Sequence, residues 1–96
     1  MKVRYTLRAH ADLDAIYTYL DQRSPVAALA VKQLIERRIA SLGDFPFAAP
    51  GTDQPNVREL TLVRYPYKVY YEVQGAEVWI IHIRHTSRHP WSANDD

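Results

Sequence analysis

Apolar and polar residues alternate with two different periodicities along this chain. Between residues 7 and 42 the apolar side chains recur at intervals of three and four, which is the spacing of one face of an α-helix. Between residues 57 and 85 apolar and polar residues alternate more nearly one by one, as in strands that cover a core on one face. Residues 3–7 alternate in the same way and predict a first strand. This order of a strand, helices and further strands predicts an α+β fold.

Two amphipathic helices are predicted one after the other. Thr6 can cap the first helix, and Ser24-Pro25 is a start signal for the second, because serine caps a helix and proline suits its first turn. We expect Gly43 to end the second helix as a left-handed cap and Pro46 to prevent its continuation. Two helices joined by so few residues form a helical hairpin. Their apolar stripes are Leu13, Ile16, Tyr17 and Leu20 in the first helix and Ala28, Val31, Ile35, Ile39 and Leu42 in the second.

Three further strands are predicted after an irregular connection at residues 45–56. They occupy residues 57–63, 66–73 and 77–85, with Gln74-Gly75-Ala76 as a three-residue hairpin turn. A two-residue turn would mix apolar and charged groups on both faces, so we favour the three-residue turn. The core face then carries Leu60, Leu62, Tyr67, Val69, Tyr71, Val73, Trp79, Ile81 and Ile83.

The opposite face of the sheet is predicted to be open and polar. The fold is therefore an N-terminal strand and a two-helix hairpin packed on one face of a small antiparallel β-sheet. The residues expected on the open face are Glu59, Thr61, Lys68, Tyr70, Glu72, Ile80, His82 and Arg84.

Composition limits the classes of function. Residues 1–96 form a single domain, because a chain of this length has room for one core. The absence of cysteine excludes disulfides and thiolate zinc sites. A net charge of +1 predicts no general attraction to nucleic acid. Neither a signal peptide nor an apolar run of about 18 residues is visible, so we expect a cytoplasmic protein that does not contact a membrane.

The charges are unevenly distributed along the chain. Residues 57–91 contain five lysines and arginines and three histidines against three acids. A local basic patch and an ordinary solvated sheet face both explain this excess.

The histidines and cations near the end of the chain are the candidates for chemistry. His82, His85 and His89 have a spacing that places the first two on opposite faces of a strand, so we expect no metal site. His85 and Arg88, with Lys68 and Tyr70, could form a group that faces a phosphate, with an acid–base histidine and an arginine clamp. The spacing alone favours a simpler interpretation, in which these residues finish a strand and contact a partner.

Taken together, the order of these segments resembles the RelE/ParE toxin superfamily, and its ParE branch in particular. The similarity covers nearly the whole chain. The segments that carry it are Ala11-Asp12-Leu13, Ile16, Tyr19-Leu20, Ser24-Pro25, Ala27-Ala28, Ile39, Leu42, Phe45-Pro46, Pro50-Gly51, Arg58-Glu59-Leu60, Tyr65-Pro66-Tyr67, Val69-Tyr70-Tyr71, Gly75, Val78, His85 and Arg88.

The resemblance implies the toxin of a type II toxin–antitoxin system, of the kind that stabilises plasmids. Such a toxin is neutralised by a cognate antitoxin, ParD-like or similar, whose extended or helical segment wraps it, and it meets operator DNA only through that antitoxin. It needs no cofactor. RelE-like members of the superfamily cut messenger RNA on the ribosome, whereas ParE-like members block DNA gyrase.

Two positions favour the ParE-like activity. Glu59 and Thr61 stand where nuclease members typically carry two catalytic lysines, and an acid there would repel phosphate. We therefore expect gyrase inhibition with no catalytic residues; the alternative is a ribosome-dependent endoribonuclease that uses Lys68, His85 and Arg88. A relic that only binds its antitoxin is a third class. The residues expected to contact target or antitoxin are Lys68, Tyr70, Arg84, His85, Arg88 and Trp91.

Overall fold

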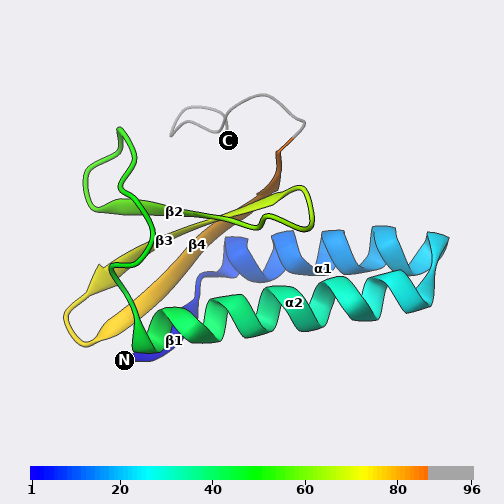
Figure 1. The fold of residues 1–96 in the computed structure, drawn as a ribbon, viewed down its shortest axis with the longest axis horizontal. Coiled ribbons are helices and arrows are strands. Elements are labelled where there is room, and N and C mark those ends of the chain that lie inside the picture. Colours follow the sequence, from blue (N-terminus) through cyan, green and yellow to red (C-terminus); the bar gives the residue numbers. More distant parts are fainter. Residues whose placement is uncertain (87–96) are drawn as a thin grey trace.

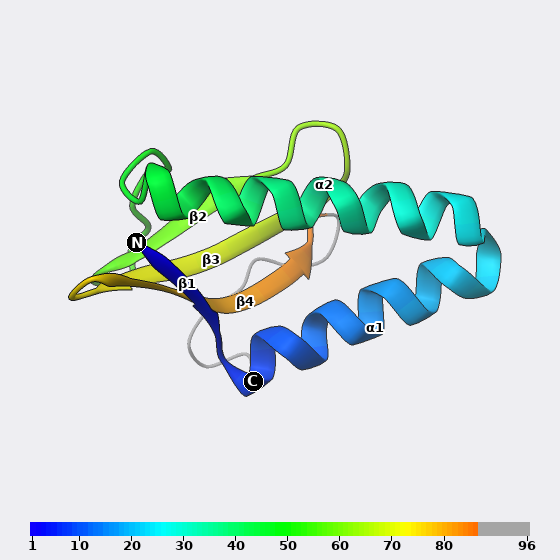
Figure 2. The same ribbon diagram turned by 90° about the horizontal axis from the view of Figure 1, so that it is seen from below.

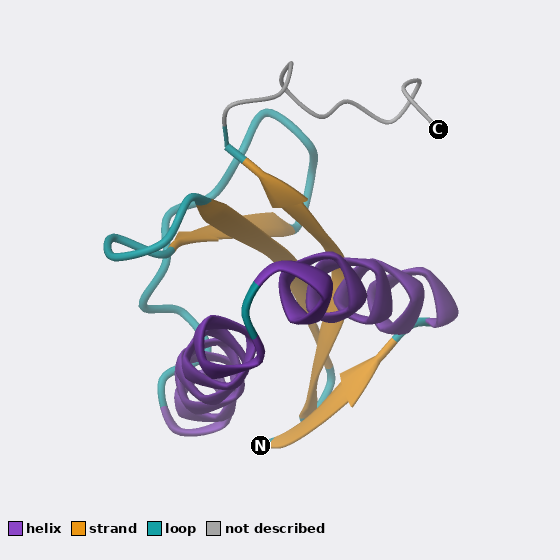
Figure 3. Cartoon of the chain, turned by 90° about the vertical axis from the view of Figure 1, so that its right-hand side faces the viewer, coloured by secondary structure: helices purple, strands orange, loops and turns teal. Residues whose placement is uncertain are grey.

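Two helices lie side by side on one face of a four-stranded sheet in this computed structural model, which describes residues 1–86 (Figures 1 and 3). The helices are joined at one end and diverge towards the other (Figure 2). This arrangement confirms the predicted helical hairpin on a sheet. Neither helix has the length and apolarity that crossing a membrane would require. The elements are β1 (Lys2–Tyr5), α1 (Leu7–Arg23), α2 (Pro25–Asp44), β2 (Val57–Thr61), β3 (Tyr67–Gln74) and β4 (Glu77–His85).

The sheet has the strand order β1-β4-β3-β2. Strands β2, β3 and β4 form the expected antiparallel meander, but β1 joins β4 in parallel, so the sheet is mixed and not purely antiparallel. The pairing of β1 with β4 runs from Lys2 opposite Glu77 to Tyr5 opposite Ile80. A salt bridge between Arg4 and Glu77 supports it. The helical hairpin lies between β1 and β2 in the sequence. It lets β1 form one edge of the sheet, beside β4, while β2 forms the opposite edge.

Side-chain caps start both helices where the sequence predicts them. The Thr6 hydroxyl accepts a hydrogen bond from the Ala9 amide at 3.1 Å, and the Ser24 hydroxyl accepts one from Ala27 at 3.2 Å. Ser24 also donates its amide to the carbonyl of Leu20, so one residue ends α1 and begins α2. This single-residue junction makes the hairpin tight.

Gly43 does not play the predicted part of a left-handed cap. Helix α2 continues through it to Asp44, and Phe45 ends the helix. Gly43 is instead a point of close approach, where a Cβ atom would lie 2.7 Å from the Met1 carbonyl oxygen. The Met1 amino group donates to the Gly43 carbonyl at 2.6 Å. The lack of a side chain therefore lets the start of the chain pack against the end of α2.

The core lies between the helical hairpin and the inner face of the sheet. The apolar stripe of α2 is buried along its whole length, as predicted. Leu13 of α1 is also buried, whereas Ile16, Tyr17 and Leu20 are only partly covered. The largest fully buried side chains are Tyr71, Ile35, Ile39, Ile80, Val69 and Val78.

The register between β3 and β4 differs from the prediction. The turn has two residues, Gly75 and Ala76, so Tyr71 lies opposite Ile80. A β-bulge between Tyr70 and Tyr71 then shifts the register, which leaves Ile81 as the extra residue and places Val69 opposite Ile83.

The bulge explains which apolar residues are buried. Ile80 is fully buried in the core, while Ile81 and Trp79 are only partly buried. The predicted assignment of Ile81 and Trp79 to the core face and of Ile80 to the polar face is therefore wrong. A two-residue turn is compatible with an apolar core because the bulge turns Ile83 back towards the helices.

Candidate functional site

The outer face of the sheet, turned away from the helices, carries two cross-strand rows of polar side chains. In the first row Glu59, Tyr70 and His82 lie opposite one another on β2, β3 and β4. In the second row Thr61, Lys68 and Arg84 occupy the same three strands. Neighbouring side chains in such rows are close enough to interact. The outer face thus brings together Lys68, Tyr70 and Arg84, as the sequence predicts. However, Tyr70 is only 5% exposed, so the prediction of an open face is wrong at this residue.

Glu59 organises the polar contacts of this face. The Tyr70 hydroxyl donates to Glu59 Oε1 at 2.9 Å, and Lys68 Nζ lies 3.2 Å from the same oxygen. Burial, together with the hydrogen bond to Glu59 and the negative charge of Glu59, raises the pKa of Tyr70 to about 12. Tyr70 is therefore a neutral donor at physiological pH, and the charge of Lys68 is offset by a carboxylate.

His82 lies beneath this face and is only 6% exposed. Its ring stacks on Tyr70, with the ring centroids 5.7 Å apart. Its Nδ1 atom lies 2.8 Å from Asp12 Oδ2, and its Nε2 atom lies 3.4 Å from a guanidinium nitrogen of Arg8. Sequence reasoning missed both partners from α1, because no local pattern relates His82 to residues that lie 70 and 74 positions away.

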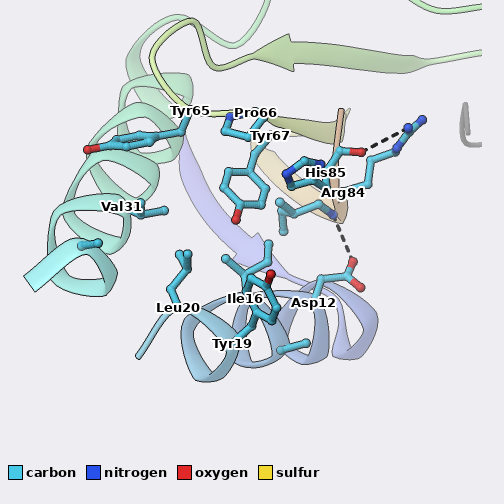
Figure 4. A pocket seen from close by; sticks show the side chains of 13 residues that line it. Asp12, Ile16, Tyr19, Leu20, Val31, Tyr65, Pro66, Tyr67, Arg84 and His85 are labelled. Carbon is cyan, nitrogen blue, oxygen red and sulfur yellow. Dashed lines mark hydrogen bonds between the residues drawn. The ribbon is translucent and has the colours of Figure 1, made fainter. Parts of the chain in front are cut away.

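A groove of about 660 Å³ opens on the other side of the sheet, between the two helices and the ends of β3 and β4 (Figure 4). Its floor is apolar and aromatic, and Asp12 and His85 are among the polar residues of its lining. Tyr19 at its margin is 52% exposed. The lining residues are Asp12, Ala15, Ile16, Tyr19, Leu20, Ala27, Val31, Tyr65, Pro66, Tyr67, Ile83, Arg84 and His85. A groove of this composition suits a row of apolar side chains from another chain.

His85 belongs to the groove and not to the outer face. It lies opposite Tyr67 and packs against the edge of that ring, with centroids 5.4 Å apart. The predicted phosphate-facing group is therefore divided, because Lys68 and Tyr70 are on one face and His85 is on the other. Arg88 and Trp91, the other two candidates, lie outside the described residues. Within residues 1–86, no cluster of three or more His, Cys, Asp or Glu side chains could hold a metal ion.

Residues 3–90 match the family described as the ParE toxin of the type II toxin–antitoxin system parDE. The chain belongs to this family. It is 37% identical over 87 residues to Toxin RelE2 of Caulobacter vibrioides, a match that covers 91% of this chain and 97% of that one. It is also 31% identical to the putative toxin Y4kP of Sinorhizobium fredii, over 88% of this chain and 86% of that one.

Solved structures of related toxins share the fold of this ParE-family chain. The chromosomal ParDE system of P. aeruginosa superposes with a TM-score of 0.77 at 35% identity, over 88% of this chain and 95% of that one. The intact E. coli RelBE toxin–antitoxin complex superposes with a TM-score of 0.69 at 14% identity, over 91% and 98% of the two chains. At that lower identity the likeness concerns the fold alone. These matches confirm the resemblance to the RelE/ParE superfamily.

Proposed function

We propose that this ParE-family toxin acts by inhibiting DNA gyrase, does not cut RNA, and is held silent by a ParD-like antitoxin. The observation that carries the proposal is the pairing of Lys68 with Glu59 on the outer face, at 3.2 Å. A phosphate that approached this face would meet the Glu59 carboxylate together with the lysine. Phosphate cleavage needs positive groups aimed at the developing charge, and each such group contributes about 3–4 kcal/mol.

The acid–base groups of the outer face also favour a role without cleavage. A general base works best when its pKa is near the working pH. The pKa of Tyr70 is raised to about 12, so its hydroxyl keeps its proton. His82 is buried, and its two ring nitrogens face Asp12 and Arg8. Neither group is placed to take a proton from an attacking hydroxyl.

The relatives support the assignment of this chain as a toxin more strongly than they support the choice of gyrase as its target. The P. aeruginosa protein that shares 35% identity is part of a system named ParDE. The Caulobacter relative at 37% identity bears the name RelE2. The proposed target therefore has two supports: the Glu59 carboxylate on the outer face, which disfavours RNA cleavage, and the ParDE relative, which favours the ParE-like activity.

Two assays with purified toxin test the target. We expect supercoiling by purified gyrase to be lost as toxin is added, and ribosome-bound message to stay intact in primer extension. Lys68→Ala should weaken gyrase inhibition if the outer face makes the contact, whereas Arg37→Ala, an exposed cation on α2, should leave it unchanged. Codon-specific cleavage of the message, with gyrase unaffected, would instead show the endoribonuclease activity of RelE-like members.

The antitoxin is proposed to occupy the groove and the adjoining helical hairpin. Aromatic anchors such as Tyr19, half-exposed beside an apolar floor, are the residues that most often dominate protein interfaces. The test is hydrogen exchange of the toxin with and without the antitoxin encoded beside it. We expect added protection within residues 8–42 and 57–73. Unchanged exchange in both ranges would refute the proposed surface. With a net charge of +1, the toxin would reach operator DNA only through the antitoxin.

A further inference from the structure

Asp12 lies where α1 meets the second half of β4. Within the described residues, β1 accompanies β4 only as far as Ile80. Beyond that point side chains from the start of α1 take the place of a strand. The Thr6 hydroxyl donates to the Ile81 carbonyl at 3.3 Å, and the Ile83 amide donates to Asp12 Oδ2 at 3.0 Å. Figure 4 shows this second bond at the margin of the groove.

The partners of His82 determine where its ring carries a proton. The Asp12 carboxylate can only accept a hydrogen bond, and the Arg8 guanidinium can only donate one. Neutral His82 therefore carries its proton on Nδ1, which donates to Asp12 Oδ2 at 2.8 Å, while Nε2 accepts from Arg8 at 3.4 Å. Arg8 Nε also lies 3.9 Å from Asp12 Oδ2, which ties the three side chains together.

The His82 ring, held by Asp12 and Arg8, contacts Tyr70 on the outer face. It lies nearly parallel to the ring of Tyr70, with an angle of 14° between them. The Tyr70 hydroxyl in turn bonds Glu59, which pairs with Lys68. A continuous series of contacts thus runs from Asp12 on α1, across β4 and β3, to Glu59 on β2.

We infer that Asp12 is a positioning residue of the toxin, which acts through the tautomer and orientation of His82 to place Tyr70 on the outer face. Its two bonds through Oδ2, to a ring and to the backbone of the same strand, hold the His82 ring in one orientation relative to β4. The significance of the outer face for toxicity rests on the proposed function, whereas the placement of Tyr70 does not.

Asp12→Ala is the informative variant because it removes Oδ2, the single oxygen that accepts from both His82 Nδ1 and the Ile83 amide. An asparagine with its amide oxygen in the same place would keep both bonds. In Asp12→Ala the Nδ1 proton of His82 loses its acceptor on α1, and the ring is no longer fixed relative to β4. Asp14→Ala is the matched control, because Asp14 is an exposed residue of the same helix and loses the same charge.

Nitrogen-15 NMR of histidine-labelled protein reads the tautomer directly, and tyrosine ring signals report the position of Tyr70. We expect an Nδ1-protonated His82 in the wild type and in Asp14→Ala. In Asp12→Ala we expect the share of the Nδ1-protonated tautomer to fall and the Tyr70 ring signals to shift. Gyrase inhibition by Asp12→Ala should need on the order of tenfold more protein, as for the loss of one charged hydrogen bond.

Several outcomes would overturn the inference. A neutral wild-type His82 with its proton on Nε2 instead of Nδ1 would do so without any variant, even if Asp12→Ala failed to fold. A folded Asp12→Ala with the Tyr70 signals of the wild type would also do so. If the tautomer and the Tyr70 signals behave as expected but the wild type leaves gyrase untouched, the proposed function fails and the positioning role of Asp12 stands.

Discussion

Ile80 and Ile81 are adjacent and chemically identical, but the β-bulge gives them different surroundings. Ile80 is fully buried, whereas Ile81 is partly exposed. Truncating Ile80 to alanine should lower the free energy of unfolding by about 2–5 kcal/mol, because it leaves a cavity in the core. Ile81→Ala should cost clearly less. Urea unfolding of both variants measures the difference, and a larger loss for Ile81→Ala would contradict the register of β4.

Gly43 gives a prediction in which two effects oppose each other. Alanine in place of glycine within a helix normally stabilises by about 1 kcal/mol. Here the new Cβ would lie 2.7 Å from the Met1 carbonyl oxygen, so β1 or α2 must shift. We expect the clash to prevail and Gly43→Ala to destabilise the fold by about 1–3 kcal/mol. Gly51→Ala, where a Cβ meets nothing within 4 Å, is the control for thermal unfolding.

Tyr70 should make stability depend on alkaline pH. Burial and Glu59 raise its pKa from 10.0 to about 12 in the folded protein. The unfolded chain therefore releases this proton first, and the contribution of neutral Tyr70 is complete below about pH 10 and lost as the pH rises towards 12. The difference in unfolding free energy between wild type and Tyr70→Phe should shrink over that interval. A constant difference would mean that the Tyr70 pKa is not raised.

At the scale of elements, both helices could be predicted because their signals are local. The caps at Thr6 and Ser24 lie within three residues of the amides that they accept from, and the α2 stripe repeats within one face. Gly43 was misjudged because its partner, Met1, lies 42 positions away. Local spacing shows where a helix can begin, but it does not show what the helix packs against.

The register of β4 could not be predicted because its sequence is ambiguous. Residues 78–81 are four apolar residues in succession, so no alternation shows which of them face the core. The bulge that resolves the pattern depends on how β3 and β4 pair in space. His85 lies in the groove because side chains alternate along β4, which puts it on the face opposite Arg84. The candidate site was therefore predicted in part: Lys68, Tyr70 and Arg84 share a face and His85 does not.

The turn between β3 and β4 offers a test at the scale of the hairpin. Gly75 has a φ of 60°, in the left-handed region that side chains disfavour. We expect Gly75→Ala to destabilise the fold by about 1–2 kcal/mol and Gly75→Asn by less, because asparagine tolerates this conformation. Thermal melts compare the two variants. Equal losses would indicate that the turn changes its conformation to accept either side chain.

At the scale of the whole molecule, a 96-residue chain buries a limited core and should gain much stability from its partner. Antitoxin at 100 times its Kd should stabilise the folded toxin by about 2.7 kcal/mol, so the melting temperature should rise with antitoxin concentration. Tyr19→Ala in the groove should reduce this gain. Leu7→Ala, which removes a side chain that is 90% exposed outside the groove, should not. The reverse ranking would place the antitoxin elsewhere.

The position of β4 in the sheet determines at which point of its synthesis the toxin can fold. Strand β4 lies between β1 and β3, but among the six elements of residues 1–86 it is the last to leave the ribosome. Until it arrives, β1 has no strand to pair with, and Ile35 and Ile39 of α2 lack part of their cover. The pairing of the first strand with the last also makes folding depend on contacts between distant segments, which form slowly. A message cut before the codon for Glu77 therefore yields a fragment without β4. Such a fragment cannot complete the sheet, and we expect proteases to degrade it before it can act as a toxin.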